Sequence, residues 1–154
     1  MNNGYEIYIN DLCELEKLLS SLAGDQTGYK PAENKWNINE IAAHLADAEI
    51  QAYVRYRSIL SDDIPFLVYN NQDKWSVELK HSTIPVSESY ELLKIVRLKN
   101  YNLICSLTGE QMRREGLHST KGKMTLEKLV ESNISHLEKH ISQIKRNIEY
   151  YKSA

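Results

Sequence analysis

The chain of 154 residues has the length of a single domain with a full hydrophobic core. Its 19 Lys and Arg stand against 21 Asp and Glu, and this balance argues against a protein dedicated to nucleic acid or to anionic membrane surfaces. No apolar run reaches the roughly 20 residues of a membrane span, and residues 1–12 lack the basic and apolar regions of a signal peptide. The sequence therefore predicts one soluble, cytoplasmic domain over residues 1–154.

The first predicted helix is marked by apolar residues at a 4-3-4-3 spacing, which places them on one helical face. These residues are Tyr8, Leu12, Leu15, Leu19 and Leu22. Gly24 follows as the expected residue just after the helix end. The linker 25–36 shows no periodicity.

The second predicted helix begins at Asn37, an N-cap residue that forms a capping box with Glu40, and runs to about Leu60. Its apolar face comprises Ile38, Ile41, Leu45, Ala48, Ala52, Tyr56 and Ile59. The following segment, 61–86, is the longest irregular region, and connections of this length usually carry function or a short helix of their own. We expect a helical turn over residues 73–79.

Two further helices complete the pattern, without convincing strand alternation anywhere between the helices. Ser87 is the expected N-cap of the third, which ends near Gly109 and buries Leu92, Val96, Leu103 and Leu107. After an irregular stretch over 113–124, Thr125 caps the fourth, with Leu126, Val130, Asn133, Leu137, Ile141, Ile144, Ile148 and Tyr151 on one face. The fold class is therefore all-α: a four-helix bundle with a long connection between helices 2 and 3 that could cross the bundle.

Three of the five histidines could share a site. His136 and His140 lie one turn apart on the fourth helix, so both imidazoles can reach one cation. Such a pair also arises by chance, and taken alone it is more typical of packed or solvated histidines. His44 lies in the middle of the second helix, and if helices 2 and 4 are neighbours it would meet the pair. Three His ligands with one open position are the donor set of a catalytic zinc site, although imidazole also suits nickel, iron and copper.

Motifs spread over nearly the whole chain support this interpretation. They are the segment 35–49 (KWNINEIAAHLADAE), the loop residues Gly116-Leu117-His118 and 122–126 (GKMTL), and the segment 136–144 (HLEKHISQI). In this order and spacing the sequence resembles the DinB/YfiT-like superfamily of metal-binding four-helix bundles.

The resemblance implies that His44, His136 and His140 bind a divalent metal, usually nickel or zinc, and that the protein is a homodimer. Members of the family include S-transferases that use the low-molecular-weight thiols bacillithiol or mycothiol, and a mycothiol-dependent maleylpyruvate isomerase. Many other members are known by name only as metal-dependent hydrolases. We therefore expect a hydrolase or a thiol S-transferase that acts on a small molecule. The alternatives are a non-catalytic dimeric bundle that binds a metal or small molecule, and a structural module in which the histidines only pack.

Further polar residues are candidates near such a site. Asp47 is either a group that orients a ligand or faces substrate, or a solvated carboxylate. Arg55 shares the face of His44 and could bind an anionic substrate, although a surface salt bridge is the more ordinary role. His118, in the loop before the fourth helix, could line the cleft, whereas His81 is expected at the surface.

Tryptophans and cysteines have plainer expectations. Trp36 and Trp75 are expected to pack the ends of the bundle, with Trp75 as a second candidate for the pocket wall. Cys13 and Cys105 match no reactive-cysteine motif or metal-ligand spacing, and small apolar packing on their helices is the simplest expectation. A thiol used in catalysis would therefore come from a cofactor.

Overall fold

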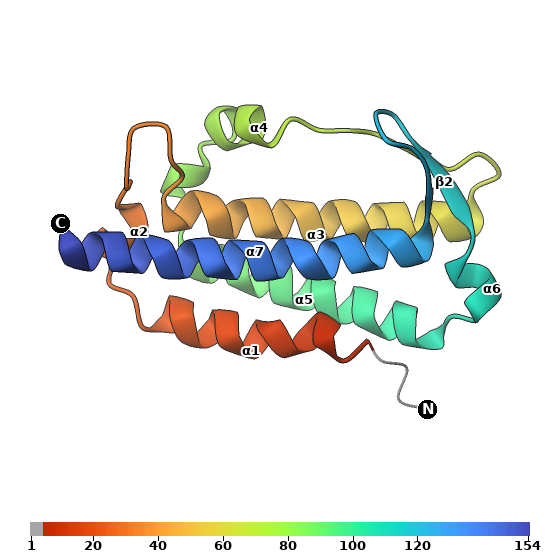
Figure 1. Ribbon diagram of the computed structural model, residues 1–154, viewed down its shortest axis with the longest axis horizontal. Coiled ribbons are helices and arrows are strands. Elements are labelled where there is room, and N and C mark those ends of the chain that lie inside the picture. The colour runs from red at the N-terminus through yellow and green to blue at the C-terminus, as the bar shows by residue number, and fades with distance from the viewer. Residues whose placement is uncertain (1–4) are drawn as a thin grey trace.

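The computed structural model describes residues 5–154, and four long helices form its frame (Figure 1). They are α1 (Ile7–Ser20), α3 (Ile38–Ser61), α5 (Val86–Ser106) and α7 (Leu126–Ser153). The shorter elements are α2 (Gly24–Gly28), β1 (Phe66–Leu67), α4 (Gln72–Glu78), the 3-10 helix η1 (His81–Thr83), α6 (Gly109–Met112), β2 (Glu115–His118) and β3 (Gly122–Thr125). Within residues 5–154 no helix is long and apolar enough to cross a membrane.

The four long helices pack as a bundle, which confirms the predicted fold class. Helix α3 packs against α5 and α7, and α1 packs against the other side of the same two helices. In Figure 1, α1 and α7 run from right to left while α3 and α5 run from left to right. Consecutive long helices α3 and α5 are therefore parallel, so the chain must return along the bundle between them.

The connection between α3 and α5 makes this return, as its length had suggested. It leaves α3 through β1, passes over the bundle through α4, and reaches the opposite end at η1 (Figure 1). The Asn39 side chain near the start of α3 donates to the Ser82 carbonyl at 3.0 Å, which ties this end of the connection down. The helical turn predicted over residues 73–79 corresponds to α4.

Two helix starts follow the predicted capping chemistry. At α3, the Asn37 side chain accepts from the Glu40 backbone N–H at 2.8 Å, and the Glu40 carboxylate accepts from the Asn37 N–H at 2.8 Å. At α7, the Thr125 hydroxyl accepts from the Lys128 N–H at 3.2 Å. Each cap satisfies backbone N–H groups that have no partner within the helix.

Two predicted boundaries are wrong by a few residues. Gly24 does not follow the first helix directly but begins α2, because the last turn of α1 is already closed by the backbone N–H groups of Ser21 and Leu22, which donate to the carbonyls of Leu18 and Leu19. Ser87 is not an N-cap, since α5 begins at Val86 with extended Pro85 as its cap. A proline fits this place because the first helical N–H groups need no intrahelical partner.

A small three-stranded sheet, ordered β1-β2-β3, was not predicted. Strand β1 pairs in parallel with β2, and β2 pairs antiparallel with β3. Strands of two and four residues are too short to show alternation in the sequence. Gly116 allows β2 to approach the bundle, since a Cβ there would lie 3.0 Å from Ile59 Cγ1 and 3.1 Å from Leu67 Cδ1.

The buried face of α5 differs from the predicted one. Leu92, expected inside, is 44% exposed. The buried residues of this helix are Ser89, Tyr90, Leu93, Arg97, Asn100 and Ile104. The buried face is therefore shifted by one position along the helix, and it includes the polar residues Arg97 and Asn100. Their partners in α3 explain why burial is tolerated.

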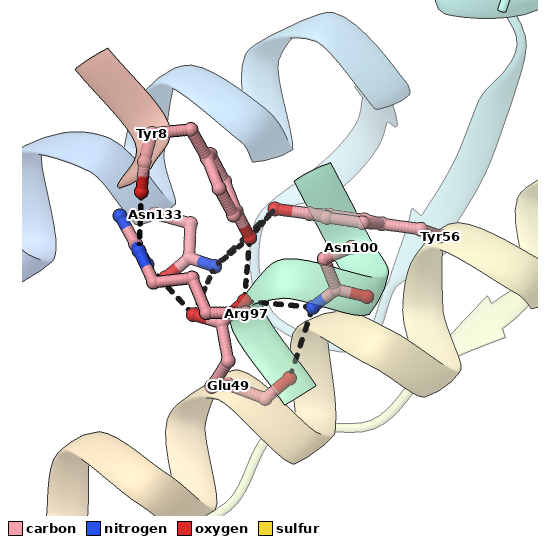
Figure 2. Close-up of polar contacts among 6 residues, drawn as sticks. All are labelled: Tyr8, Glu49, Tyr56, Arg97, Asn100 and Asn133. Atoms are coloured by element: carbon pink, nitrogen blue, oxygen red, sulfur yellow. Dashed lines mark hydrogen bonds and ion pairs between the residues drawn. The ribbon is translucent and has the colours of Figure 1, made fainter. Parts of the chain in front are cut away.

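These partners form a network at the centre of the bundle, to which all four long helices contribute (Figure 2). Glu49 of α3 accepts from Arg97 Nη1 at 2.7 Å, and both side chains are 1% exposed. The same carboxylate accepts from the Tyr8 hydroxyl at 2.6 Å, from Asn100 Nδ2 at 2.7 Å and from Asn133 Nδ2 at 3.1 Å. Because a buried carboxylate needs this many donors, the network fixes how α1, α3, α5 and α7 align.

Candidate metal centre

Three imidazoles converge between α3 and α7. His44 Nε2 lies 2.9 Å from His136 Nε2, which lies 3.2 Å from His140 Nε2. One ring nitrogen from each residue lies within 4.8 Å of the others. A tetrahedral ion with bonds of about 2.0–2.1 Å holds its ligand atoms about 3.3 Å apart, so the three nitrogens are spaced for a single ion.

The environment keeps these rings neutral, which ligation requires. Burial, followed by the neighbouring histidines, lowers the pKa of His44 to about 3. Burial and His140 lower the pKa of His136 to about 4, and burial also lowers the pKa of His140. Close packing of three rings that resist protonation is expected where a cation supplies the positive charge.

His140 is also oriented by a neighbour on its own helix. Its Nδ1 lies 2.8 Å from Gln143 Oε1. Because the amide oxygen can only accept, Nδ1 carries the ring proton and Nε2 presents a lone pair to the other two histidines. The donor set of three neutral imidazoles therefore fits a divalent transition metal.

Trp36 lies against this cluster rather than only at the end of the bundle. Its ring centre is 5.0 Å from that of His44, and it stacks on His140 with ring centres 6.3 Å apart and planes 12° apart. Asn147 of α7 donates to the Trp36 carbonyl at 2.9 Å and holds the segment in place. Trp36 thus covers one side of the histidines with an apolar surface.

A cavity of about 260 Å³ opens beside the histidines, bounded by α3, α7, the segment after β1 and the turn between β2 and β3. His44 and His136 form part of its wall, as do Tyr56 and Asn133 of the central network. A molecule in this cavity would therefore lie directly beside the three-histidine cluster. Trp75 instead lines an adjoining, largely apolar groove together with Val54 and Phe66, and Arg55 borders both the groove and the cavity.

Two of the other candidates also line the cavity. Arg55 is partly buried, and its Nη2 donates to the Val68 carbonyl at 2.7 Å. Within residues 5–154 it forms no ion pair, so the surface salt bridge considered for it is not found. His118, the last residue of β2, is 5% exposed, and burial lowers its pKa.

Asp47 and His81 form a contact that the sequence analysis missed. His81 is 2% exposed rather than at the surface, and its Nε2 lies 3.0 Å from Asp47 Oδ2. Burial raises the pKa of Asp47, while His81 opposes this shift. The contact holds η1 against α3, and Asp47 lies three residues after His44 on that helix. No spacing in the sequence signals it, because the two residues are brought together only by the returning connection.

The cysteines lie away from the histidines. Cys13 is exposed, so the apolar packing expected for it is not found, while Cys105 is partly buried on α5. Neither residue lines the cavity or joins the three-histidine cluster among the described residues.

Comparison with known proteins agrees with this geometry. A protein of Oceanobacillus iheyensis named "Putative metal-dependent hydrolase" is 27% identical over 91% of this chain and 79% of its own length. "Putative metal-dependent hydrolase YfiT" of Bacillus subtilis is 28% identical over 85% of this chain and 74% of its own length. The solved structure of YfiT, described as a probable metal-dependent hydrolase with an unusual four-helix bundle topology, superimposes with a TM-score of 0.88. That match covers 96% of this chain and 85% of the YfiT chain at 22% identity, and it supports the fold.

The family assignment rests on the match to a family model. The family model of the DinB superfamily matches residues 13–144, a range that contains all three histidines of the cluster. The chain therefore belongs to the DinB superfamily.

Proposed function

We propose that the protein is a metal-dependent enzyme that activates water or a low-molecular-weight thiol for reaction with a small molecule. The observation that carries this proposal is the convergence of His44, His136 and His140 beside a cavity of about 260 Å³. The names of the relatives support hydrolysis. Thiol transfer uses the same donor set, with the thiol supplied by a cofactor.

The residues in and around the cluster have different roles in this proposal. The three imidazoles would hold nickel or zinc, Gln143 keeps the His140 proton on Nδ1, and Trp36 limits water on one side. A divalent ion held by neutral ligands lowers the pKa of bound water or thiol toward about 7, which provides a nucleophile at neutral pH. The cavity admits the second reactant next to the cluster.

Thiol transfer has one structural observation in its favour. Among the described residues that line the cavity, no Asp or Glu is present to act as a general base for water. Glu49, the acid of the core network, already accepts hydrogen bonds from Arg97 and Asn100. A thiol has an ordinary pKa of about 8.5, against about 15.7 for water, so it ionises on a metal with less help from such a base.

Metal content tests the proposal. We expect about one Ni, Zn, Fe or Mn ion per chain in the purified protein, and a loss of at least about tenfold in the double variant His136→Ala/His140→Ala, because one remaining ligand cannot hold the ion. The matched control is Glu138→Ala/Lys139→Ala, which changes two exposed residues of the same helical turn. Wild-type protein without metal above background would overturn the proposal.

Activity assays separate the two reactions. The metal-loaded protein is incubated with a panel of esters and amides, and separately with a thiol and an electrophile such as monochlorobimane. Turnover lost in the double variant but kept in its control identifies the reaction. A stable metal-bound protein with no turnover in either panel supports the non-catalytic binding bundle instead.

We also propose that two copies of the chain form a homodimer. An exposed apolar surface supports this assembly, since large apolar patches mark interaction sites; it is formed by Val54, Phe66, Val68 and Trp75, which line one groove. Light scattering after gel filtration should give twice the chain mass of 17.8 kDa. The Val54→Lys variant should shift the protein toward the monomer, and a monomeric wild type would contradict the proposal.

A further inference from the structure

Among the described residues that line the cavity, the ionised side chains are all positively charged. Arg55 lies in its wall and Lys121 at the exposed turn between β2 and β3, whereas no carboxylate lines it among the described residues. Arg55 is partly buried, which lowers its pKa, and within residues 5–154 its guanidinium forms no ion pair with an acid. A partly buried cation without a counter-charge is expected where a ligand supplies the negative charge.

The Arg55 side chain is held in place but not saturated. One of its five N–H donors is used by the Val68 carbonyl. Val68 directly follows β1, which pairs with β2 through Leu67 and His118. The strand pairing that positions His118 therefore also positions the guanidinium.

His118 provides a second donor in the wall of the same cavity. Its Nδ1 accepts from the Thr120 backbone N–H at 3.2 Å, so in the neutral ring the proton lies on Nε2. Burial, together with the positive charges of Arg55 and Lys121, lowers the pKa of His118 and keeps the ring neutral. Its Nε2–H is then a donor for a group in the cavity that His118 lines.

The distance between Arg55 and the metal ligands sets the shape of the ligand. His44 and Arg55 are eleven residues apart on α3, which corresponds to about 16 Å along the helix axis and nearly the same face. Both line the same cavity. A molecule held by Arg55 can therefore place its other end beside the three histidines.

We propose that Arg55 and His118 form a subsite for a single carboxylate, so that the substrate is an elongated small molecule with its acid at this subsite and its reacting group beside the histidines. Arg55 is the one partly buried cation of this subsite, His118 is neutral, and Lys121 stands exposed at the turn, so the subsite matches a carboxylate rather than a phosphate dianion. The inference deepens the proposed function, and it rests on that function only for the position of the reacting group.

Two thiols that differ only at the far end test the subsite. Cobalt-loaded protein is titrated with mercaptohexanoate and with mercaptohexanol, and the sulfur-to-cobalt absorption band reports binding. We expect the carboxylate to bind at least about tenfold tighter than the alcohol, as for a charge-assisted hydrogen bond. Arg55→Gln should abolish this preference, and Arg55→Lys should retain part of it.

The matched control is Arg146→Gln, which removes the same charge from an exposed position of α7 that borders a different pocket. It should keep the full preference for the carboxylate. Equal binding of the two thiols by the wild type, or an unchanged preference in Arg55→Gln, would overturn the subsite while leaving the metal centre intact.

A metal-free arm keeps the two proposals separable. If the protein binds no cobalt, the proposed function fails, and the subsite is tested by titrating hexanoate while following the NMR signals of the Arg55 and His118 side-chain N–H groups. Saturable shifts that vanish in Arg55→Gln support the subsite. Absence of such shifts in the wild type would overturn it.

Discussion

The central ion pair offers a sharp test of the packing argument. Replacing Arg97 with Met keeps an unbranched side chain but leaves Glu49 buried without its counter-charge. The Glu49 carboxylate keeps donors from Tyr8, Asn100 and Asn133, so it is still hydrogen-bonded. Breaking a buried pair in this way costs about 3–5 kcal/mol, which is a large share of the roughly 5–15 kcal/mol that stabilises a typical domain.

Urea unfolding followed by circular dichroism measures this loss. With a dependence of about 2 kcal/mol per molar urea, a loss of about 4 kcal/mol lowers the midpoint by about 2 M. The double variant Glu49→Gln/Arg97→Met should recover at least half of the loss, because it removes the uncompensated charge. The exposed pair Lys123–Glu115, 3.6 Å apart, provides the control, and Lys123→Met should change stability by about 0–1 kcal/mol. If Arg97→Met is no more destabilising than Lys123→Met, the network does not hold the helices as argued.

Three further predictions concern other parts of the molecule. Gly116→Ala should lower stability by about 1–3 kcal/mol in urea unfolding, since its methyl group would press on Ile59 and Leu67, and an unchanged midpoint would refute the close approach of β2. Chelation of the bound metal should lower the melting temperature of the wild type but not that of His136→Ala/His140→Ala. Metal-free protein should lose stability as pH falls below 6.5, because the folded-state pKa is about 3 for His44 and about 4 for His136, so the unfolded chain binds more protons. The slope approaches about 1.4 kcal/mol per pH unit for each histidine, and His136→Gln should flatten it.

Most of the long helices were predictable because capping residues and the spacing of apolar residues are visible in short segments of the sequence. The capping box of Asn37 and Glu40 and the cap at Thr125 lie within one helical turn, and the apolar face of α3 repeats with the helical period. The same reasoning failed at α5, where Arg97 and Asn100 occupy buried positions that periodicity assigns to apolar side chains. Their burial is explained by Glu49 of α3, whose carboxylate accepts hydrogen bonds from both, and the sequence of α5 alone does not reveal this partner.

The histidine cluster was partly predictable for a related reason. The spacing of His136 and His140 places both on one face of a single helix, whereas the participation of His44 depends on which helices are neighbours. Resemblance to the family implied that His44 joins the pair, and the packing of α3 against α7 brings the three residues together. His81 had no such signal, and its burial against Asp47 follows from the path of the connection between α3 and α5.

The histidines and the rest of the cavity wall are positioned by different parts of the fold. Arg55 and His118 are 63 positions apart in the chain, and they line the same cavity because the two-residue strand β1 pairs in parallel with β2. The three clustered histidines lie on α3 and α7, whose alignment is fixed by the network around Glu49, whereas the proposed anion subsite depends on the small sheet. Changes in the sheet can therefore alter which substrate is bound without moving the histidines. This separation would allow relatives with the same three-histidine cluster to act on different molecules.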